Sequence, residues 1–250
     1  MTRVDAVGPR AALEQARAAA FPPGEFVGQE SFITAGEIRE LAERAAIGPG
    51  TRVLDLCCGI GGPGCFITRS TDCTYLGVDD NPSAVRTARE RAGGLPCEFR
   101  VQRVPPLPRG SFDVVLLLET MLAFPDKRPL LDAVAGALPP RGRFALTLEA
   151  GSPLTDAERA AMPGGETVWP VPLETMLAEL RRAGLAVGWW RDVTEGHRTA
   201  AEGLLRAYRE AASAIGPEAS GHLLHTHRIW VDWLAGGRVR KLLLVAERSS

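Results

Sequence analysis

The sequence is poor in lysine and has no long apolar run. Of its 250 residues, 29 are Lys or Arg and 30 are Asp or Glu, which gives a formal net charge of −1. The two signs are interspersed, so the chain lacks the basic field that nucleic-acid binding requires. No apolar stretch approaches the roughly 20 residues of a membrane span, and the N-terminus MTRVDAVGPR is charged where a signal peptide needs an apolar segment. These absences disfavour nucleic-acid and membrane partners and predict a cytoplasmic location.

Cysteine and lysine are both unevenly used. The five cysteines, an odd number, lie within residues 57–97 and form no CxxC pair, which favours reduced thiols over a disulfide framework. Lys127 and Lys241 are the only two lysines of the sequence, and we interpret this together with the high alanine content as codon bias. All five tryptophans and all four histidines lie in the last third of the chain, which indicates a second part with its own role.

Short apolar segments alternate with amphipathic ones from Thr34 onward. Thr34 and Glu37 form a capping box at the start of one helix, and Asn81 with Pro82 begins another. Near-continuous apolar strands separated by helices predict a parallel sheet that is covered on both faces. We therefore expect an α/β fold, a doubly wound, Rossmann-like, mostly parallel seven-stranded sheet with helices on both faces and a helical cap. The expected strands are 51–56, 74–79, 97–104, 112–119, 143–149, 186–193 and 239–246, and residues 150–171 are expected to form a loop.

The stretch VLDLCCGIGGPG, residues 53–64, places four glycines directly after the first strand. Its GIGGPG fits the dinucleotide pattern GxGxxG, and Asp79 follows at the distance expected of a ribose-binding acid. Three details favour another adenosine cofactor. Asp55 places a carboxylate inside the strand, where a ligand ammonium would pair with it. A long segment with a capped helix precedes the strand, and Pro63 with Gly64 weakens the helix start on which a pyrophosphate would rest.

With their neighbours, these segments resemble the class I methyltransferases that use S-adenosylmethionine. They are most similar to the small-molecule group that includes the sarcosine and dimethylglycine enzymes and many natural-product enzymes. The resemblance runs from about residue 26 to 248 and is carried by VLDLCCGIGGPG, GVDDNPSAV, LLLETMLAFPDK and the N-terminal GQESFIT. It implies S-adenosylmethionine as the cofactor and a small-molecule acceptor that is methylated at O, N or C, in bacterial secondary metabolism.

The resemblance also implies a set of cofactor-binding residues. Two positions depart from the family pattern. Cys57 stands where a glycine is usual, which requires a negative φ at this position, and Arg103 stands where an Asp usually meets the adenine. Since a guanidinium cannot accept a hydrogen bond, adenine recognition then rests on the backbone of Val104. The implied residues are Asp55, Cys57, Gly59 and Gly61 at the methionine part, Asp79 at the ribose, Gln102 and Val104 at the adenine, Gln29 and Ser31 from the lid, and Leu118 and Glu119 from the fourth strand.

The candidate catalytic residues are His197 and Glu119. Methyl transfer is an in-line displacement in which the enzyme chiefly aligns the reacting atoms, and a base helps where the acceptor loses a proton. Glu119 ends a strand at the edge where such sheets bind ligands, and His197 follows the strand 186–193. His227 lies on an apolar helical face and is expected to be a core histidine. His222 and His225 lack further ligands, so no metal is expected.

The sequence therefore predicts an S-adenosylmethionine-dependent methyltransferase with an aromatic small-molecule acceptor and a homodimeric assembly. Two alternatives stay open, an NAD(P)-dependent oxidoreductase and a protein of this fold that binds S-adenosylmethionine without methylating. The expected parts are lid helices at 1–50, the cofactor core at 51–150, and 151–250 with the acceptor-pocket cap helices and the last two strands.

Overall fold

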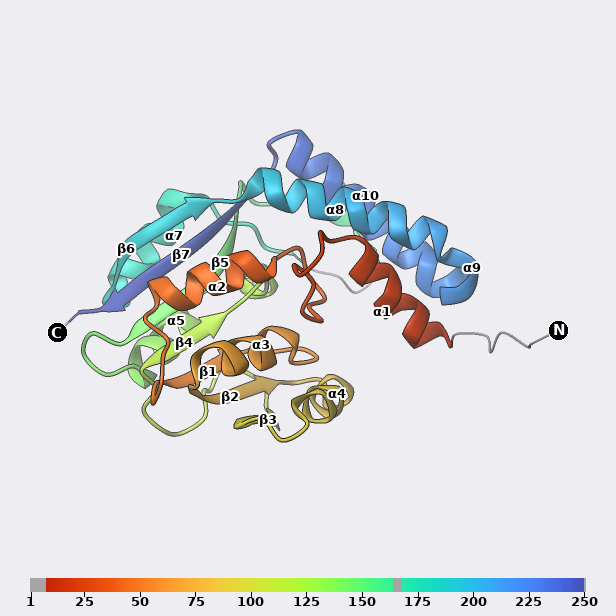
Figure 1. Ribbon diagram of the computed structural model, residues 1–250. Coiled ribbons are helices and arrows are strands. Elements are labelled where there is room, and N and C mark those ends of the chain that lie inside the picture. Colours follow the sequence, from red (N-terminus) through yellow and green to blue (C-terminus); the bar gives the residue numbers. More distant parts are fainter. Residues whose placement is uncertain (1–7, 164–167, 250) are drawn as a thin grey trace.

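A seven-stranded sheet runs through the structure in the order β3-β2-β1-β4-β5-β7-β6 (Figure 1). The computed structural model describes residues 8–163 and 168–249. Only β7 runs antiparallel to its neighbours, β5 and β6, so the expected mostly parallel, doubly wound sheet is confirmed. The strands are β1 Arg52–Leu56, β2 Thr74–Asp79, β3 Cys97–Val101, β4 Val114–Leu117, β5 Arg143–Ala150, β6 Leu185–Asp192 and β7 Arg240–Arg248.

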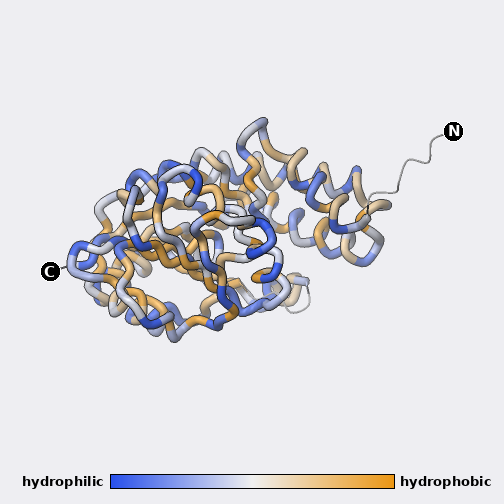
Figure 2. The backbone as a smooth tube through the Cα atoms, turned by 60° about the horizontal axis from the view of Figure 1, so that its bottom comes forward, coloured by the Kyte–Doolittle hydropathy of each residue, from blue (hydrophilic) through white to orange (hydrophobic). Residues whose placement is uncertain are grey.

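Helices cover both faces of the sheet because each presents one apolar side to it. On one face pack α2 (Ala35–Arg44), α3 (Gly62–Thr71) and α4 (Pro82–Ala92), and on the other α5 (Arg128–Ala137) and α7 (Leu173–Arg182). Both expected N-terminal caps, at Thr34 and at Asn81, are present. Figure 2 shows the apolar residues concentrated along the strands, inside this two-sided cover.

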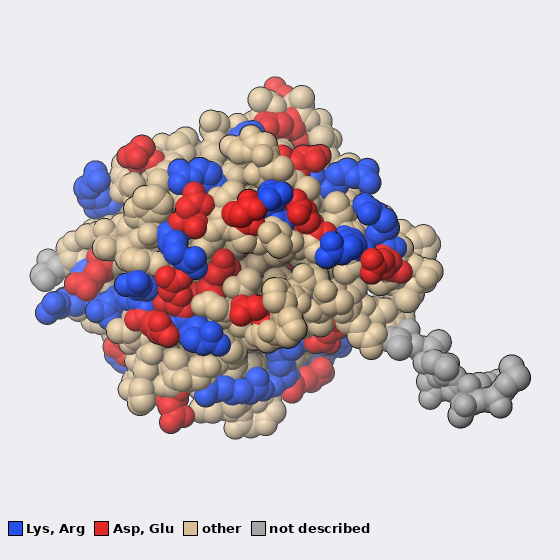
Figure 3. All heavy atoms as spheres, turned by 45° about the horizontal axis from the view of Figure 1, so that its top comes forward, with Lys and Arg blue, Asp and Glu red and all other residues tan. Residues whose placement is uncertain are grey.

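Four further helices pack against one another at one end of the sheet. They are α1 (Pro9–Ala19), α8 (Thr194–Glu210), α9 (Ala212–Ile215) and α10 (Pro217–Ala235), and they bury a separate apolar cluster around Phe32, Tyr208 and Trp230. Among the described residues, none of the helices has the length and apolar character needed to cross a bilayer. Lys, Arg, Asp and Glu are intermixed on the face shown in Figure 3.

Two local expectations were wrong. Pro63 and Gly64 were expected to weaken the helix start after the glycine loop, but helix α3 begins at Gly62 with Pro63 in its first turn. The missing N–H of proline costs nothing at this position, because it would have no helical partner. Within 150–171, the structure has a short helix α6 (Asp156–Ala161) whose capping box joins Thr155 and Glu158, a T-x-x-E signal present in the sequence. A 3-10 turn, η1 (Met121–Ala123), follows β4.

Cys57 has a left-handed backbone, with a φ of +57°. The expectation of a negative φ at this position was therefore wrong, and Cys57 adopts the conformation of the glycine that it replaces. A residue with a side chain costs about 1–2 kcal/mol in this region, because its Cβ approaches the following carbonyl oxygen. The first turn of the glycine loop is therefore strained.

We predict that Cys57→Gly unfolds at higher denaturant concentration than Cys57→Ala, with a difference in free energy of unfolding of about 1 kcal/mol. Both substitutions remove the half-buried thiol, but only glycine relieves the backbone strain. Equilibrium urea unfolding of the two variants checks this. Equal stabilities would show that the loop tolerates the Cβ at no cost.

Candidate active site

Two cavities adjoin at the carboxyl ends of β1 and β4. The glycine-loop cavity, of about 160 Å³, is lined by the lid segment 28–31, by the glycine loop and by the end of β4. The cap cavity, of about 360 Å³, lies between the lid segment, η1 and helices α8 and α10. Glu30, Ser31 and Glu119 line both, so these three residues form a shared wall. The two cavities therefore lie on either side of the same three residues.

The glycine-loop cavity brings together most of the residues expected to bind the cofactor's methionine part. Asp55, at the end of β1, is buried and accepts a hydrogen bond from the Tyr75 hydroxyl. Burial raises the pKa of Asp55 to about 7, although the Tyr75 hydrogen bond acts to lower it. A buried carboxylate of this kind fits a ligand ammonium, which would supply the charge that the site lacks. The expected residues in the lining are Gln29, Ser31, Asp55, Cys57, Gly59, Leu118 and Glu119.

Gln29 lines this cavity, but its amide is used within the lid segment. Its Oε1 accepts from the backbone N–H of Val27 at 2.7 Å, and its Nε2 donates to the carbonyls of Glu25 at 3.0 Å and Ile33 at 2.8 Å. Gln29 therefore holds the lid segment in shape. Direct cofactor contact by its side chain stays a prediction.

The residues expected at the ribose and adenine lie outside the lining of this cavity. Asp79 accepts from the backbone N–H groups of Gly59 and Asn81, both at 2.9 Å, so it ties the glycine loop to the start of α4. Gln102 donates to the Pro106 carbonyl at 2.8 Å, and Val104 packs in the core. Gly61, expected at the methionine part, also lies outside the lining and packs against Ala88 and Phe99. Their roles toward the cofactor remain predictions.

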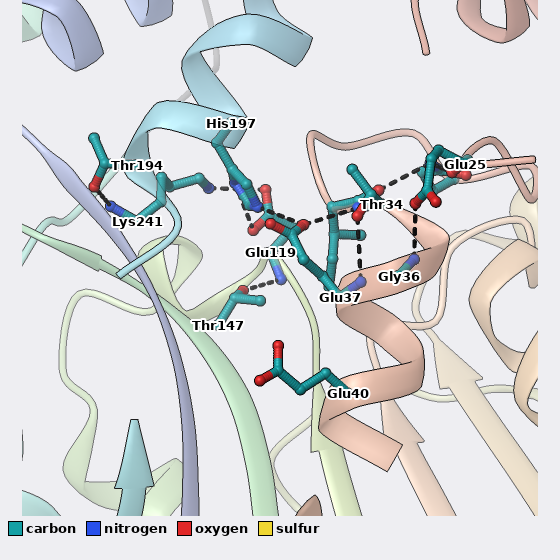
Figure 4. A network of polar contacts seen from close by, with 12 residues as sticks. Glu25, Thr34, Gly36, Glu37, Glu40, Glu119, Thr147, Thr194, His197 and Lys241 are labelled. Carbon is teal, nitrogen blue, oxygen red and sulfur yellow. Dashed lines mark hydrogen bonds and ion pairs between the residues drawn. The ribbon is translucent and has the colours of Figure 1, made fainter. Parts of the chain in front are cut away.

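Five buried side chains form a network next to the shared wall, called here the buried charge cluster: Glu37, Glu119, Glu149, His197 and Lys241. Figure 4 labels Glu37, Glu119, His197 and Lys241 of this cluster. The Lys241 ammonium donates to Glu119 at 2.8 Å and to Glu149 at 2.6 Å. His197 Nε2 lies 3.0 Å from Glu37 Oε2, and its Nδ1 lies 3.7 Å from Glu119 Oε1. Burial alone would raise the pKa of Glu119, but the positive charges of Lys241 and His197 hold it below its usual range.

His197 follows β6 as expected, but it does not reach either cavity. Its side chain is fully buried and lies behind Glu119, and it is not among the residues that line either cavity. Helix α8 begins at Thr194, which places His197 in the first helical turn, facing Glu37 of α2. Of the two candidate catalytic residues, only Glu119 reaches the cavities. His197 contacts Glu119 at 3.7 Å, and it lines neither cavity itself.

Sequence reasoning missed Lys241 and the role of Glu37. Lys241 lies on β7 directly opposite Glu149 of β5, and is 2% exposed. The available signal was a charged residue inside the apolar run VRKLLLVA. Lys127, the other lysine, is also buried, donating to the carbonyls of Phe124 and Trp169. Codon bias explains neither position, since both side chains have specific buried partners.

The cap cavity has aromatic walls. Phe32 meets Trp230 and His227 edge to face, each at 5.8 Å between ring centroids, and Tyr208 meets His227 at 4.9 Å. Of the five tryptophans only Trp230 is in the lining, whereas Trp190 is 47% exposed on β6. His227, expected to be a core histidine, is half-buried and lines the cavity, with Nδ1 2.8 Å from the Leu223 carbonyl.

Comparison with known proteins agrees with this arrangement. Residues 47–168 match the family described as a methyltransferase domain. The chain is 27% identical over 204 residues to the methyltransferase GfsG of Streptomyces halstedii, covering 77% of this chain and 72% of that protein. It is 33% identical over 166 residues to the 27-O-demethylrifamycin SV methyltransferase of Amycolatopsis mediterranei, covering 62% of this chain and 61% of that protein.

Among solved structures, a candidate sarcosine dimethylglycine methyltransferase from Galdieria sulphuraria has the same fold. Its TM-score is 0.76 at 17% identity, with 85% of each chain covered. The fold is thus that of the class I methyltransferases. The chain is an S-adenosylmethionine-dependent methyltransferase, as its sequence predicts.

We predict that Asp55 makes stability pH-dependent. Its folded pKa, about 7, lies above the value of about 3.9 expected in the unfolded chain, so it contributes stability below pH 4 that is lost as the pH rises to 7. Relative to Asp55→Asn, the protein should lose up to about 4 kcal/mol of unfolding free energy over this range. Urea unfolding of both proteins at a series of pH values checks this. A constant difference between the two proteins would contradict the raised pKa.

Asp79→Ala should weaken binding of S-adenosylhomocysteine by about 1–3 kcal/mol, because the carboxylate would accept hydrogen bonds from the ribose and also holds Gly59 in place. Isothermal titration calorimetry measures the change. Asp80→Ala, at the next position along the chain, is the matched control and should bind normally. Unchanged affinity in the Asp79 variant would contradict the ribose assignment.

Proposed function

We propose that this protein transfers a methyl group from S-adenosylmethionine to a hydroxyl oxygen of a largely apolar, aromatic small molecule in bacterial secondary metabolism. The single observation that supports this best is the shared wall of Glu30, Ser31 and Glu119. A cofactor against the glycine loop and an acceptor under the cap helices would meet at this wall. S-adenosylmethionine, when bound, supplies a methyl group already activated on a sulfonium sulfur.

The residues at the wall suit an acceptor that loses a proton. Glu119 is held ionised by Lys241 and His197, so its carboxylate can accept a hydrogen bond from a hydroxyl and orient the oxygen lone pair toward the neighbouring cavity. His197 and Glu37 fix Glu119 from behind. We therefore assign Glu119 as the candidate catalytic residue and His197 as a positioning residue.

The lining of the cap cavity favours an uncharged acceptor body. Its apolar residues include Phe32, Leu122, Leu223 and Trp230, which can cover a flat or branched hydrocarbon surface. Its two cations are already paired, Arg17 with Glu30 at 2.6 Å and Lys241 with Glu119. A phosphate-bearing acceptor would need cations that are not committed in this way. The 27-O-demethylrifamycin SV methyltransferase, 33% identical, is named for an oxygen acceptor.

The oxidoreductase alternative is disfavoured by charge and by topology. The glycine-loop cavity is lined by Glu30, Asp55 and Glu119, and its lining, within the described part of the chain, has no Lys or Arg. This lining offers a pyrophosphate no cationic partner, whereas the ionised Glu119 carboxylate can pair with a cation. Dinucleotide folds also typically have the strand order 3-2-1-4-5-6, whereas here β7 is inserted between β5 and β6.

We further propose the division into a lid at 1–50, a cofactor core at 51–150 and a cap with the last two strands at 151–250. The two cavities support this division, because the lid segment contributes to both of them. A homodimeric assembly and a cytoplasmic location, expected from the sequence, are kept as proposals. All five cysteines are free thiols, which is compatible with a reducing compartment.

Incubating the purified protein with S-adenosylmethionine and a panel of hydroxylated aromatic polyketides should give products that carry one additional O-methyl group, identified by mass spectrometry and NMR. Trp230→Ala should raise the acceptor KM by about tenfold, because it removes a buried aromatic wall, and should leave S-adenosylhomocysteine binding unchanged. The exposed Trp190→Ala is the matched control. Methylation at nitrogen or carbon would contradict the oxygen assignment, and cofactor binding without any product would favour the non-methylating alternative.

A further inference from the structure

The buried charge cluster contains more carboxyl groups than cations. Glu37, Glu119 and Glu149 face one ammonium, Lys241, and one imidazole, His197. The exposed fraction of each of the five side chains is 9% or less. Carboxylates therefore outnumber positive charges whichever protonation state His197 adopts. An uncompensated buried charge is costly, so the cluster is suited to a further positive charge nearby.

Unpartnered atoms indicate where that charge belongs. Among the described residues, Glu119 Oε1, Glu149 Oε2 and His197 Nδ1 are buried without a hydrogen-bond partner. Glu119 is the only one of these three residues that lines the cavities, and it lines both. Its second oxygen, Oε2, is already bound to Lys241. Oε1 faces His197 Nδ1 at 3.7 Å, and Glu119 is the carboxylate through which the cluster reaches the shared wall, where the methyl group would cross.

The positive groups near Glu119 are shared with other carboxylates, since His197 also faces Glu37. Lys241 lies between the Phe32 and Trp230 rings, 5.4 and 5.3 Å from their centroids, and its ammonium donates hydrogen bonds to Glu119 Oε2 and Glu149 Oε1. Arg17, in the cap-cavity lining, is paired with Glu30. The wall therefore retains a net negative character toward the glycine-loop cavity.

We propose that the buried charge cluster, acting through Glu119, recognises the positive charge that distinguishes S-adenosylmethionine from its product S-adenosylhomocysteine. This inference rests on the proposed function of the same site. Methyl transfer turns the sulfonium into a neutral thioether and the acceptor hydroxyl into an ether, with one proton released. The same step removes the charge that the cluster binds, so the site holds the product less tightly than it would by shape alone.

Binding of three ligands that differ at the sulfur position tests this proposal by calorimetry on the full chain. S-adenosylmethionine and sinefungin carry a positive charge there, the latter on an amine, and S-adenosylhomocysteine does not. Glu119→Gln should raise the Kd of the two charged ligands by about tenfold and that of the neutral one by less than about twofold. Equal weakening of all three ligands would overturn the proposal.

Two further variants separate charge recognition from structural damage. Glu149→Gln leaves the Glu119–Lys241 pair intact and lies behind the wall, so it should shift the same ligand ratio in the same direction by about threefold. Glu40→Gln, the matched control, removes a carboxyl group that pairs with Arg191 and lines neither cavity, and should leave the Kd of all three ligands unchanged. A ratio unmoved by Glu149→Gln would overturn the role of the cluster. If the unmodified protein bound none of the three ligands, the proposed function would fail together with this inference.

Discussion

The Lys241 ammonium between Glu119 and Glu149 is the interaction on which the site depends. It joins the ends of β4, β5 and β7, and through His197 and Glu37 the same network reaches α8 and α2. Breaking one partner of a buried ion pair typically costs about 3–5 kcal/mol, since the other charge is left buried alone. The sheet, the cap and the lid helix are thus tied together at one point, and that point borders both cavities.

The lid is fixed at a second point by Arg17. This residue of α1 pairs with Glu30 at 2.6 Å and donates to the Tyr208 hydroxyl of α8 at 3.3 Å. At its other side, α1 contacts α4 of the core through an ion pair between Glu14 and Arg91 at 2.9 Å. Helix α1 therefore bridges core and cap across the lid segment. Glu30 is held by Arg17 of α1, and Glu119 is held by Lys241 of β7. These two ion pairs fix the shared wall before a ligand binds.

Much of the fold could be predicted from the sequence because its signals are local. The apolar strands, the capping box at Thr34 and the Asn81 cap depend on residues a few positions apart, and each is present. The site was less predictable because its contacts are distant in sequence. Lys241 meets Glu149 only through the β5–β7 register, and His197 meets Glu37 only because the first turn of α8 lies next to the first turn of α2. The positive φ of Cys57 was also not predictable from the residue type, because a residue with a side chain prefers a negative φ. The closure of the glycine loop imposes the positive value.

The glycines of the loop show why such a pattern alone does not identify a cofactor. At Gly62 a Cβ would overlap the backbone of Gly28 in the lid, and at Gly64 it would overlap the Tyr75 ring. Only Gly59 faces open space, with the Glu30 carboxylate at 4.0 Å from a built Cβ. Three of the four loop glycines, Gly61, Gly62 and Gly64, therefore allow close packing within the protein, and Gly59 exposes backbone to a ligand. A dinucleotide and a sulfonium nucleoside would both accept that backbone, so the choice between them falls to the rest of the lining, whose described residues include the ionised Glu119 and no Lys or Arg, and which therefore favours a cation.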